Sequence, residues 1–207
     1  MGVALAAVIG YLLGSIPVSP LVSKLYRAGV DVRNFGSGKT GFTNSLRVLG
    51  LRRSIPVFAG DFSKGLIASF LPLLWTDDPW ARAAAGVSAV IGHVWPVFAD
   101  FRGGRGILAG AGALVAFNPL AAAAVIPVMA LSVGLTRYVS LGSITTAFAA
   151  GVVFVGLAAF DVHSWAYAAA AVVGSSLIIL MHHDNIGRLL AGTERKLGQG
   201  GDRRAAT

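Results

Sequence analysis

Residues 141–160 read LGSITTAFAAGVVFVGLAAF, and this uncharged apolar run decides the fold class. A helix needs about 20 apolar residues to cross a bilayer, and further runs of this kind recur along the chain. No segment alternates apolar and polar residues over about ten positions, as the strands of a membrane barrel do. The sequence therefore predicts an all-α, polytopic integral membrane protein with about seven transmembrane helices. We expect these helices at residues 3–25, 53–75, 81–99, 106–117, 119–136, 141–160 and 163–182.

The middle of the chain leaves an alternative open. The runs at 81–99, 106–117 and 119–136 are short for a span, and Pro119 and Pro127 can break or kink a helix. About five spans with two half-helices therefore stand as an alternative to seven. Either arrangement uses the whole of residues 1–207, so we expect one integral membrane domain and no separate soluble domain.

The composition fits a chain whose surface faces lipid. Charged residues make up 13% of the chain and hydrophobic residues 55%, whereas soluble domains carry about 25% charged residues. The absence of cysteine excludes disulfides, thiolate nucleophiles and cysteine-based metal sites. The net charge of +8 would suggest nucleic acid in a soluble protein, but in a membrane protein it indicates Lys- and Arg-rich cytoplasmic loops. We therefore expect membrane lipid, and no nucleic acid, as a partner.

The distribution of the basic residues predicts the orientation. The first cations follow the first apolar run, which suits an uncleaved helix with its N-terminus outside. With seven spans, only Arg82 then remains outside, and the C-terminus is cytoplasmic. This asymmetry predicts the inner (plasma) cell membrane, with the polar loops on its cytoplasmic side. The cations that fall inside are Lys24, Arg27, Arg33, Lys39, Arg47, Arg52, Arg53, Lys64, Arg102, Arg105, Arg137, Arg188, Arg195, Lys196, Arg203 and Arg204.

The longest polar segment, residues 31–47, has the composition of an anion site. It combines several glycines with the hydroxyl of Ser37 and the cations Lys39 and Arg47. Glycine lets backbone N–H groups converge on one point, and arginine can bind a phosphate with two hydrogen bonds. Part of the segment has P-loop character, but the glycine spacing and the preceding strand of a P-loop are missing, so we exclude that function. The alternative to a phosphate site is a flexible polar loop.

Two further segments connect apolar runs. Gly103, Gly104 and Gly106 lie where one helix is expected to end and the next to begin, with Arg105 among them. Free N–H groups at a helix N-terminus favour an anion, and glycine lets a ligand approach the backbone. A tight turn with cations at the lipid headgroups is the alternative. In the segment 137–143, the hydroxyls that could cap a helix or contact a ligand belong to Ser140 and Ser143.

The last polar segment, residues 182–194, begins with two histidines. His182 and Asn185 are three residues apart, so a continuing helix would place both on one face. A metal site needs three or four converging ligands, and the sequence offers no partner cluster, so we expect no metal. Elsewhere, we expect Asp61 and Lys64 to form a structural ion pair and His93 to bond a backbone carbonyl.

Taken together and in this order, these segments resemble the acyl-phosphate:glycerol-3-phosphate acyltransferases, the PlsY family. The likeness covers nearly the whole chain, and its specificity comes from the order of motifs that are weak individually. The matching stretches are Gly14–Pro17, Gly36–Gly38 with Gly41, Thr43, Asn44 and Arg47, Asp61–Gly65, Gly92–Phe98, Arg102–Gly106, Ser140–Ser143, and Asn185–Ile186 with Gly192–Glu194.

The resemblance implies a seven-helix enzyme without metal or cofactor. Such an enzyme moves a fatty acyl group from acyl phosphate to the 1-hydroxyl of glycerol 3-phosphate, giving lysophosphatidic acid and phosphate. The family's essential Ser and Arg match Ser37 and Arg47. Its third motif contributes a His, an Asn and a Glu, which match His182, Asn185 and Glu194. The glycines that match its acyl-phosphate motif are Gly103, Gly104 and Gly106.

The chain departs from the family pattern at several positions. The family usually has Asn at position 39, Ala at 42 and Lys at 102 and 105, where this chain has Lys39, Phe42, Arg102 and Arg105. Arginine keeps the charge but not the compact geometry of lysine. The third motif usually reads Arg-His-Arg-Glu-Asn and here reads Met-His-His-Asp-Asn at 181–185. We expect these changes to affect phosphate binding and to leave the fold intact.

The resulting hypothesis is a monomeric enzyme that works by positioning its substrates and stabilising charge. The proton of the attacking hydroxyl goes either to His182 or to the leaving phosphate, and the resemblance favours the phosphate. The competing hypotheses are a membrane transporter or channel for a phosphorylated solute and a non-catalytic scaffold. The residues expected to contact substrate are Ser37, Lys39, Asn44, Arg47, Gly103, Gly104, Arg105, Gly106, Ser140, Ser143, His182, Asn185 and Glu194.

Overall fold

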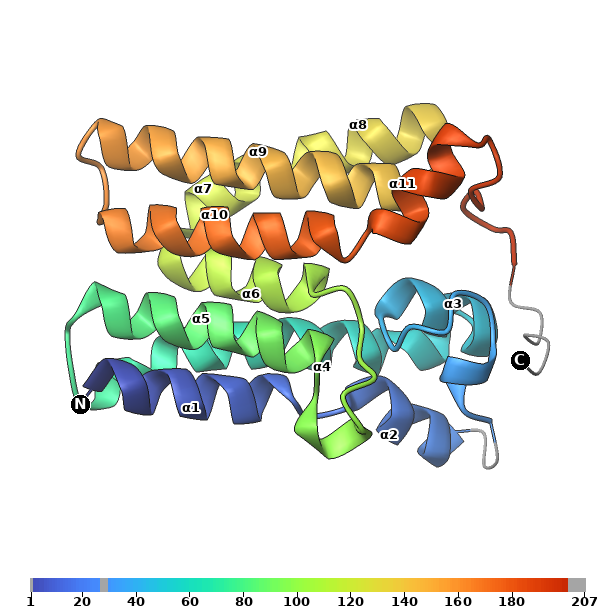
Figure 1. The fold of residues 1–207 in the computed structure, drawn as a ribbon, viewed down its shortest axis with the longest axis horizontal. Helices are drawn as coiled ribbons and strands as arrows, with labels where there is room; N and C mark the ends of the chain where they lie inside the picture. The colour runs from blue at the N-terminus through green and yellow to red at the C-terminus, as the bar shows by residue number, and fades with distance from the viewer. Residues whose placement is uncertain (1, 27–29, 201–207) are drawn as a thin grey trace.

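The structure, a computed structural model, describes residues 2–26 and 30–200. Within those residues the regular elements are all helices, which confirms that the fold is all-α. Figure 1 shows the longer helices side by side along the long axis, with three shorter ones gathered at one end: α2 (Val18–Tyr26), α3 (Phe42–Leu49) and α11 (His183–Leu190). Arg27, Arg203 and Arg204, which entered the orientation prediction, lie outside the described residues.

Four segments of the described chain are long and apolar enough to cross a membrane, and they are Gly2–Tyr26, Leu51–Leu74, Pro119–Thr136 and Val139–Ala159. A fifth arises if α10 (Trp165–Leu180) and α11, which meet at a bend of 55°, are counted as one. The longer helices are α1 (Gly2–Gly14), α4 (Leu51–Phe70), α5 (Pro79–Val94), α6 (Ile107–Phe117), α8 (Ile126–Thr136), α9 (Val139–Ala159) and α10 (Trp165–Leu180). The remaining short elements are α7 (Pro119–Ala124), η1 (Val32–Asn34), η2 (Leu71–Leu74) and η3 (Val97–Ala99).

Prolines explain the main differences between the expected and the observed helices. The run expected at 3–25 is broken after Gly14, where α1 ends, and α2 begins at Val18, directly after Pro17. The helix expected at 81–99 ends at Val94, shortly before Pro96. The helix expected at 119–136 divides next to Pro127, as its sequence had indicated. Each break follows from the missing N–H of proline and from the crowding of its ring against the preceding turn.

Small residues allow α1 and α5 to pack with their backbones in close approach. A Cβ added at Gly10 would lie 2.3 Å from the carbonyl oxygen of Ala85, and one at Gly14 would lie 2.2 Å from that of Ala89. Close backbone packing through small residues is typical of membrane helices, where lipid provides no hydrophobic drive for association. The pair therefore forms a rigid support for the segments that follow each helix.

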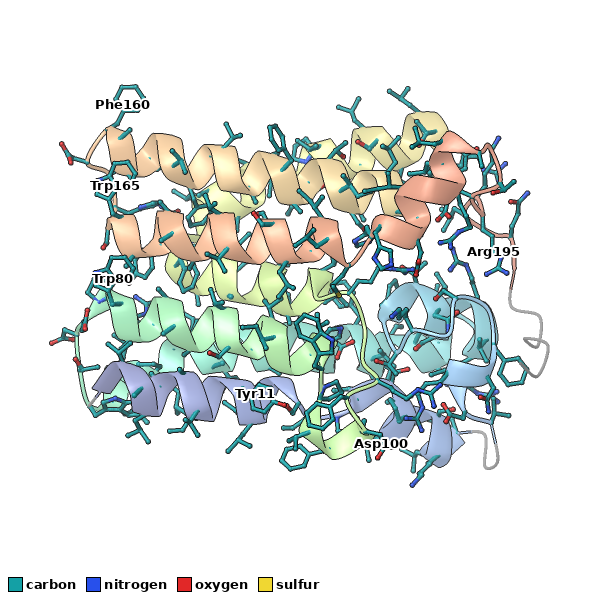
Figure 2. The ribbon with its side chains drawn as sticks, viewed as in Figure 1. Tyr11, Trp80, Asp100, Phe160, Trp165 and Arg195 are labelled. Atoms are coloured by element: carbon teal, nitrogen blue, oxygen red, sulfur yellow. The ribbon has the colours of Figure 1, made fainter. Side chains whose placement is uncertain are left out.

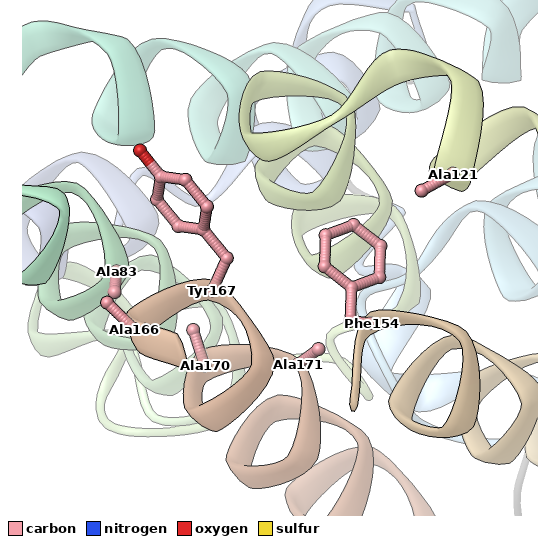
Figure 3. Packing of buried hydrophobic residues seen from close by; sticks show 7 residues of the cluster. All are labelled: Ala83, Ala121, Phe154, Ala166, Tyr167, Ala170 and Ala171. Atoms are coloured by element: carbon pink, nitrogen blue, oxygen red, sulfur yellow. The ribbon is translucent and has the colours of Figure 1, made fainter. Parts of the chain in front are cut away.

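The other half of the bundle is organised around Phe154 and Tyr167. Figure 3 shows these two rings among small alanines of neighbouring helices, including Ala83 of α5 and Ala121 of α7. Arg82 closes this region by donating to the Tyr167 hydroxyl (2.9 Å) and to the Ser69 carbonyl (3.1 Å). The one cation predicted to lie outside therefore serves packing.

The two ends of the bundle differ in chemistry. Trp80, Phe160 and Trp165 are exposed and lie at one end, whereas Arg195 lies at the opposite end, beside α11 (Figure 2). Aromatic side chains of this kind commonly sit at the level of the lipid headgroups. The short helices and the polar segments singled out in the sequence share the end that carries Arg195 (Figures 1 and 2).

Candidate active site

A polar pocket of about 50 Å³ opens where α3, α9 and α11 meet. It brings together most of the residues that the sequence predicted to contact substrate, although they come from segments more than 100 residues apart. The predicted residues in its wall are Ser37, Arg47, Arg105, Ser140, Ser143, His182, Asn185 and Glu194.

Asn44 shapes the loop that carries Ser37. Its side-chain NH₂ group donates to the carbonyls of Val32 (2.9 Å), Phe35 (3.1 Å) and Lys39 (3.0 Å). Its Oδ1 accepts the backbone N–H of Ser37 at 3.0 Å. Because Asn44 is buried and fully engaged in these bonds, its structural contribution is to fold the loop over the start of α3. Both Asn44 and Lys39 also line an adjoining cavity.

Four arginines line the pocket, and two of them, Arg47 and Arg105, are the most buried. Within the described chain, no carboxylate lies at ion-pair distance from Arg47 or Arg105, and Arg105 bonds only the Met181 carbonyl (3.3 Å). Burial, together with the neighbouring Arg195, lowers the pKa of Arg47. Burial also lowers the pKa of Arg105 to about 10, which leaves it charged at neutral pH. Two half-buried cations without a direct ion-pair partner form an anion site, since a bound anion would offset their desolvation.

Glu194 holds the opposite wall of the pocket in place. It accepts hydrogen bonds from Ser140 Oγ (2.8 Å), Asn185 Nδ2 (2.6 Å) and Arg188 Nε (2.6 Å). Burial alone would raise the pKa of Glu194, but these hydrogen bonds and the charge of Arg188 bring it below its ordinary value. The carboxylate thus joins α9, α11 and the segment after α11. Asn185 Oδ1 is buried and accepts no hydrogen bond from the described residues, which leaves it available to a ligand donor.

His182 lies at the junction of α10 and α11, beyond the apolar helix that ends at Leu180. The sequence argument supposed a continuous helix here, but the chain bends between α10 and α11. Both His182 and Asn185 nevertheless line the pocket. The Nδ1 atom lies 2.7 Å from the carbonyl of Ile178, so Nδ1 carries the proton and Nε2 has the free lone pair. Burial, with a smaller effect of Arg105, lowers the pKa of His182 to about 4. The imidazole is therefore a neutral hydrogen-bond acceptor.

The polar pocket continues into two larger cavities. A cavity of about 240 Å³ shares Ser37, Arg47, Arg105 and His182 with the pocket. It meets an apolar cavity of about 450 Å³ inside the bundle, with which it shares Phe58, Ile107, Leu108, Met129 and Ser143. The site therefore combines a charged end with an adjoining apolar chamber, as a ligand with a charged head and a hydrocarbon chain requires.

The glycine turn at 103–106 borders this site unevenly. Gly106 adopts a φ of +86° at the start of α6 and lines the middle cavity. Gly103 and Gly104 line none of the three cavities, and both are buried against α5. Their N–H groups donate to the carbonyls of Val94 (3.2 Å) and His93 (3.1 Å). In the structure they fix the path of the turn behind Arg105.

Four residues that line the pocket were not among the predicted contacts: Thr43, Val139, Arg188 and Arg195. Arg188 follows Asn185 by one helical turn and Arg195 follows Glu194, so helical spacing and adjacency could have pointed to both. By contrast, His183 is exposed and contacts its neighbour Asp184 at 3.0 Å.

A model of the family described as glycerol-3-phosphate acyltransferase matches residues 4–192. The chain belongs to the glycerol-3-phosphate acyltransferase family. The acyltransferase of Thermoanaerobacter sp. (strain X514) is 43% identical to it over 199 residues, covering 96% of this chain and 98% of that protein. The acyltransferase of Symbiobacterium thermophilum is 42% identical and covers 93% of each.

Two solved structures of the family are similar in three dimensions. The crystal structure of PlsY (YgiH), an integral membrane glycerol 3-phosphate acyltransferase, superposes in its glycerol 3-phosphate form with a TM-score of 0.86, at 36% identity over 96% of both chains. Its lysophosphatidic acid form gives 0.84, at 35% identity and the same coverage. With these matches, the apolar helices identify the chain as a multi-pass integral membrane protein of the acyltransferase family.

Proposed function

We propose that this acyltransferase moves a fatty acyl group from acyl phosphate to the 1-hydroxyl of glycerol 3-phosphate. The observation that carries the proposal is that the pocket holding Arg47 and Arg105 adjoins, through a middle cavity with shared lining residues, an apolar cavity of about 450 Å³. Both substrates carry phosphate, and one of them also carries a hydrocarbon chain. The arginines therefore suit the phosphate that both substrates carry, and the apolar cavity suits the hydrocarbon chain of the acyl phosphate.

The chemistry requires positioning more than it requires a protein nucleophile. Acyl phosphate is a mixed anhydride, so the glycerol hydroxyl oxygen attacks the acyl carbon directly, and phosphate leaves with the electron pair of the broken C–O bond. The leaving phosphate accepts the hydroxyl proton. His182 Nε2, a neutral acceptor, orients that hydroxyl by hydrogen bonding before attack. The enzyme lowers the barrier by holding both reactants and by stabilising the departing charge.

The proposed roles follow from the positions of the side chains. Arg47, Ser37 and Arg105 bind phosphate, and Arg105 does so beside the N-terminus of α6, which itself favours an anion. Asn185 Oδ1 accepts from a glycerol hydroxyl. The remaining predicted residues shape or border the site, and they are Lys39, Asn44, Gly103, Gly104, Gly106, Ser140, Ser143 and Glu194.

We infer seven crossings, with the N-terminus outside and the C-terminus in the cytoplasm. In Figure 1 the chain runs along the long axis in alternating directions, through α1–α2, α4, α5, the shorter α6, α7–α8, α9 and α10. The first crossing starts at the end rich in exposed aromatic rings, and the last finishes at the basic end. The positive-inside rule places that basic end, and the site with it, in the cytoplasm. The proposed unit is a single domain, 1–207, acting as a monomer in the inner cell membrane.

The decisive experiment is an assay of the purified full chain in detergent or lipidic mesophase. Palmitoyl phosphate and glycerol 3-phosphate are supplied, and phosphate and lysophosphatidic acid are followed with time, with an acyl-CoA donor in a parallel reaction. We expect product from acyl phosphate alone. A folded protein that forms no product from either donor, or that uses only acyl-CoA, would overturn the proposal.

A further inference from the structure

A buried ionisable cluster lies next to the site without taking part in the proposed chemistry. Lys64 Nζ and Asp61 Oδ1, both on α4, are 3.0 Å apart, so the expected ion pair is confirmed. His93 Nδ1 of α5 lies 3.4 Å from the same oxygen, so the expectation that this ring bonds a backbone carbonyl is wrong. Lys64 also donates to the carbonyl of Ile16, at the break between α1 and α2 (3.3 Å). These contacts join three parts of the bundle.

Stability alone is a poor explanation for this cluster. All three side chains are at least 94% buried, with relative exposures of 2% for Asp61, 6% for Lys64 and 5% for His93. Asp61 Oδ2 is buried without a hydrogen-bond partner among the described residues. Removing such charges from water costs about as much as their attraction returns, and apolar side chains of similar size often stabilise as well. The position of the cluster offers a better explanation.

The cluster is in direct contact with the glycine turn. His93 accepts the N–H of Gly104 through its carbonyl, and its ring packs against the same glycine. A Cβ added at Gly104 would lie only 2.2 Å from His93 Nε2. The ring therefore fills the space beside Gly104, and its Nδ1, which has no hydrogen-bond partner among the described residues, lies 3.4 Å from Asp61 Oδ1 on the other side.

The turn carries two groups that we assign to phosphate binding. Arg105 follows Gly104 directly, and α6 begins two residues later with its free N–H groups. Asp61 and His93 line the same middle cavity as Arg47, Arg105 and His182. A displacement of the ring would thus move one cation and one helix N-terminus relative to the rest of the site.

We propose that Asp61, Lys64 and His93 are positioning residues that hold the 103–106 turn, and through it Arg105 and the start of α6, in place for acyl phosphate. None of the three contacts the reacting atoms. The inference rests on the proposed function, because it assigns the turn to the acyl-phosphate half of that reaction. It predicts that disturbing the cluster weakens binding of one substrate more than the other.

The first test measures the kinetics of His93→Ala and Asp61→Asn in the full chain. Each variant should raise KM for palmitoyl phosphate by about tenfold or more while changing KM for glycerol 3-phosphate by less than about twofold. Ser69→Ala is the matched control, because Ser69 is also fully buried on α4 but does not line the three cavities. A merely structural role would lower the thermal stability of His93→Ala and Asp61→Asn and would not separate the two KM values.

The second test is a double-mutant cycle between His93→Ala and Gly104→Ala. Gly104→Ala should raise KM for palmitoyl phosphate by about tenfold in the wild-type background, because the new methyl group meets the imidazole. In the His93→Ala background that space is free, so the further increase should be less than about threefold. Equal effects of Gly104→Ala in both backgrounds would overturn the proposal.

The outcomes separate this inference from the proposed function. The positioning role is wrong, and the function stands, if the wild-type enzyme makes lysophosphatidic acid but the variants Asp61→Asn and His93→Ala do not separate the two KM values. That is the case if both KM values rise equally or if neither changes. If the wild-type protein makes no product, the proposed function fails first. Should His93→Ala not fold, the near-isosteric Asp61→Asn decides by the same KM ratio, since it preserves the shape of the cluster.

Discussion

Arg47 combines charge, partial burial and the absence of an ion-pair partner among the described residues. Such a group should contribute little to folding and much to binding an anion. We expect Arg47→Ala to lower kcat/KM by about a hundredfold or more, because a bidentate contact to phosphate is lost. Arg47→Lys should recover only part of the activity, since lysine keeps the charge without the fork of donors. Steady-state assays of both variants check this.

The control for Arg47 is the thermal unfolding temperature of the detergent-solubilised protein. It should be unchanged or slightly raised in Arg47→Ala, because burial opposes the charged form of the wild-type side chain. A variant with near-normal turnover and affinity would show that the phosphate assignment is wrong.

His182 makes a prediction about pH. Its pKa lies at about 4 in the folded protein, below the ordinary value of 6.5, because burial disfavours the charged ring. Between these two values the unfolded chain binds more protons at this residue, so its contribution to stability falls as pH is lowered through that window. We expect the ring ¹⁵N resonances of His182 to report a neutral Nδ1–H tautomer at about pH 5.5. The resonances are assigned to His182 by their absence in His182→Gln. A charged ring at that pH would contradict the prediction.

Glu194 illustrates how one side chain can organise several elements. Its bonds reach Ser140 at the start of α9 and both Asn185 and Arg188 on α11. Glu194→Ala leaves these donors without their acceptor, so we expect a loss of stability of roughly 1.5–3 kcal/mol. We also expect kcat/KM to fall by about tenfold or more, because Asn185 loses its fixed orientation.

A comparison with Thr193→Ala checks the specificity of that prediction. Thr193 precedes Glu194, is exposed and has one weak side-chain hydrogen bond, to the Arg188 carbonyl at 3.5 Å. Its variant should behave like the wild-type enzyme in thermal unfolding and in turnover. Equal losses in both variants would mean that the segment as a whole, and not the carboxylate, supports the site.

At the scale of the whole molecule, the natural lack of cysteine makes the proposed orientation directly testable. Val162 lies between α9 and α10, and Ala191 directly follows α11; both are exposed, so each can be replaced by a single cysteine. The α9–α10 connection and α11 lie at opposite ends of the bundle (Figure 1). In intact spheroplasts, a membrane-impermeant maleimide should label Val162→Cys and leave Ala191→Cys unlabelled. Both should react after the membrane is permeabilised. The reverse pattern would place the site on the outer side.

The bundle also explains why the site is stable although its segments are polar. The close contact of α1 with α5 and the alanine-rich packing around Phe154 hold the spans. At the polar end, α2 and α3 are held on α4 by a buried apolar cluster of Val22, Val32, Leu49 and Val57. Binding groups are thus presented on a rigid frame, which limits the misplacement that would slow the reaction.

The sequence alone determined the fold class, the polar segments and most of the residues that line the pocket. Hydropathy and charge are local properties that can be read residue by residue, and the order of motifs such as Gly36–Arg47 and His182–Glu194 specified the family. The tertiary structure decided which groups converge.

It showed that Asn44 folds the first loop, that Glu194 joins two helices, and that Gly103 and Gly104 lie behind the cavity wall. It also placed His93 against the glycine turn. These relations depend on the bends near Pro17, Pro96 and residue 182 and on the packing of helices distant in the sequence, and no local pattern encodes the direction in which a side chain points after such a bend.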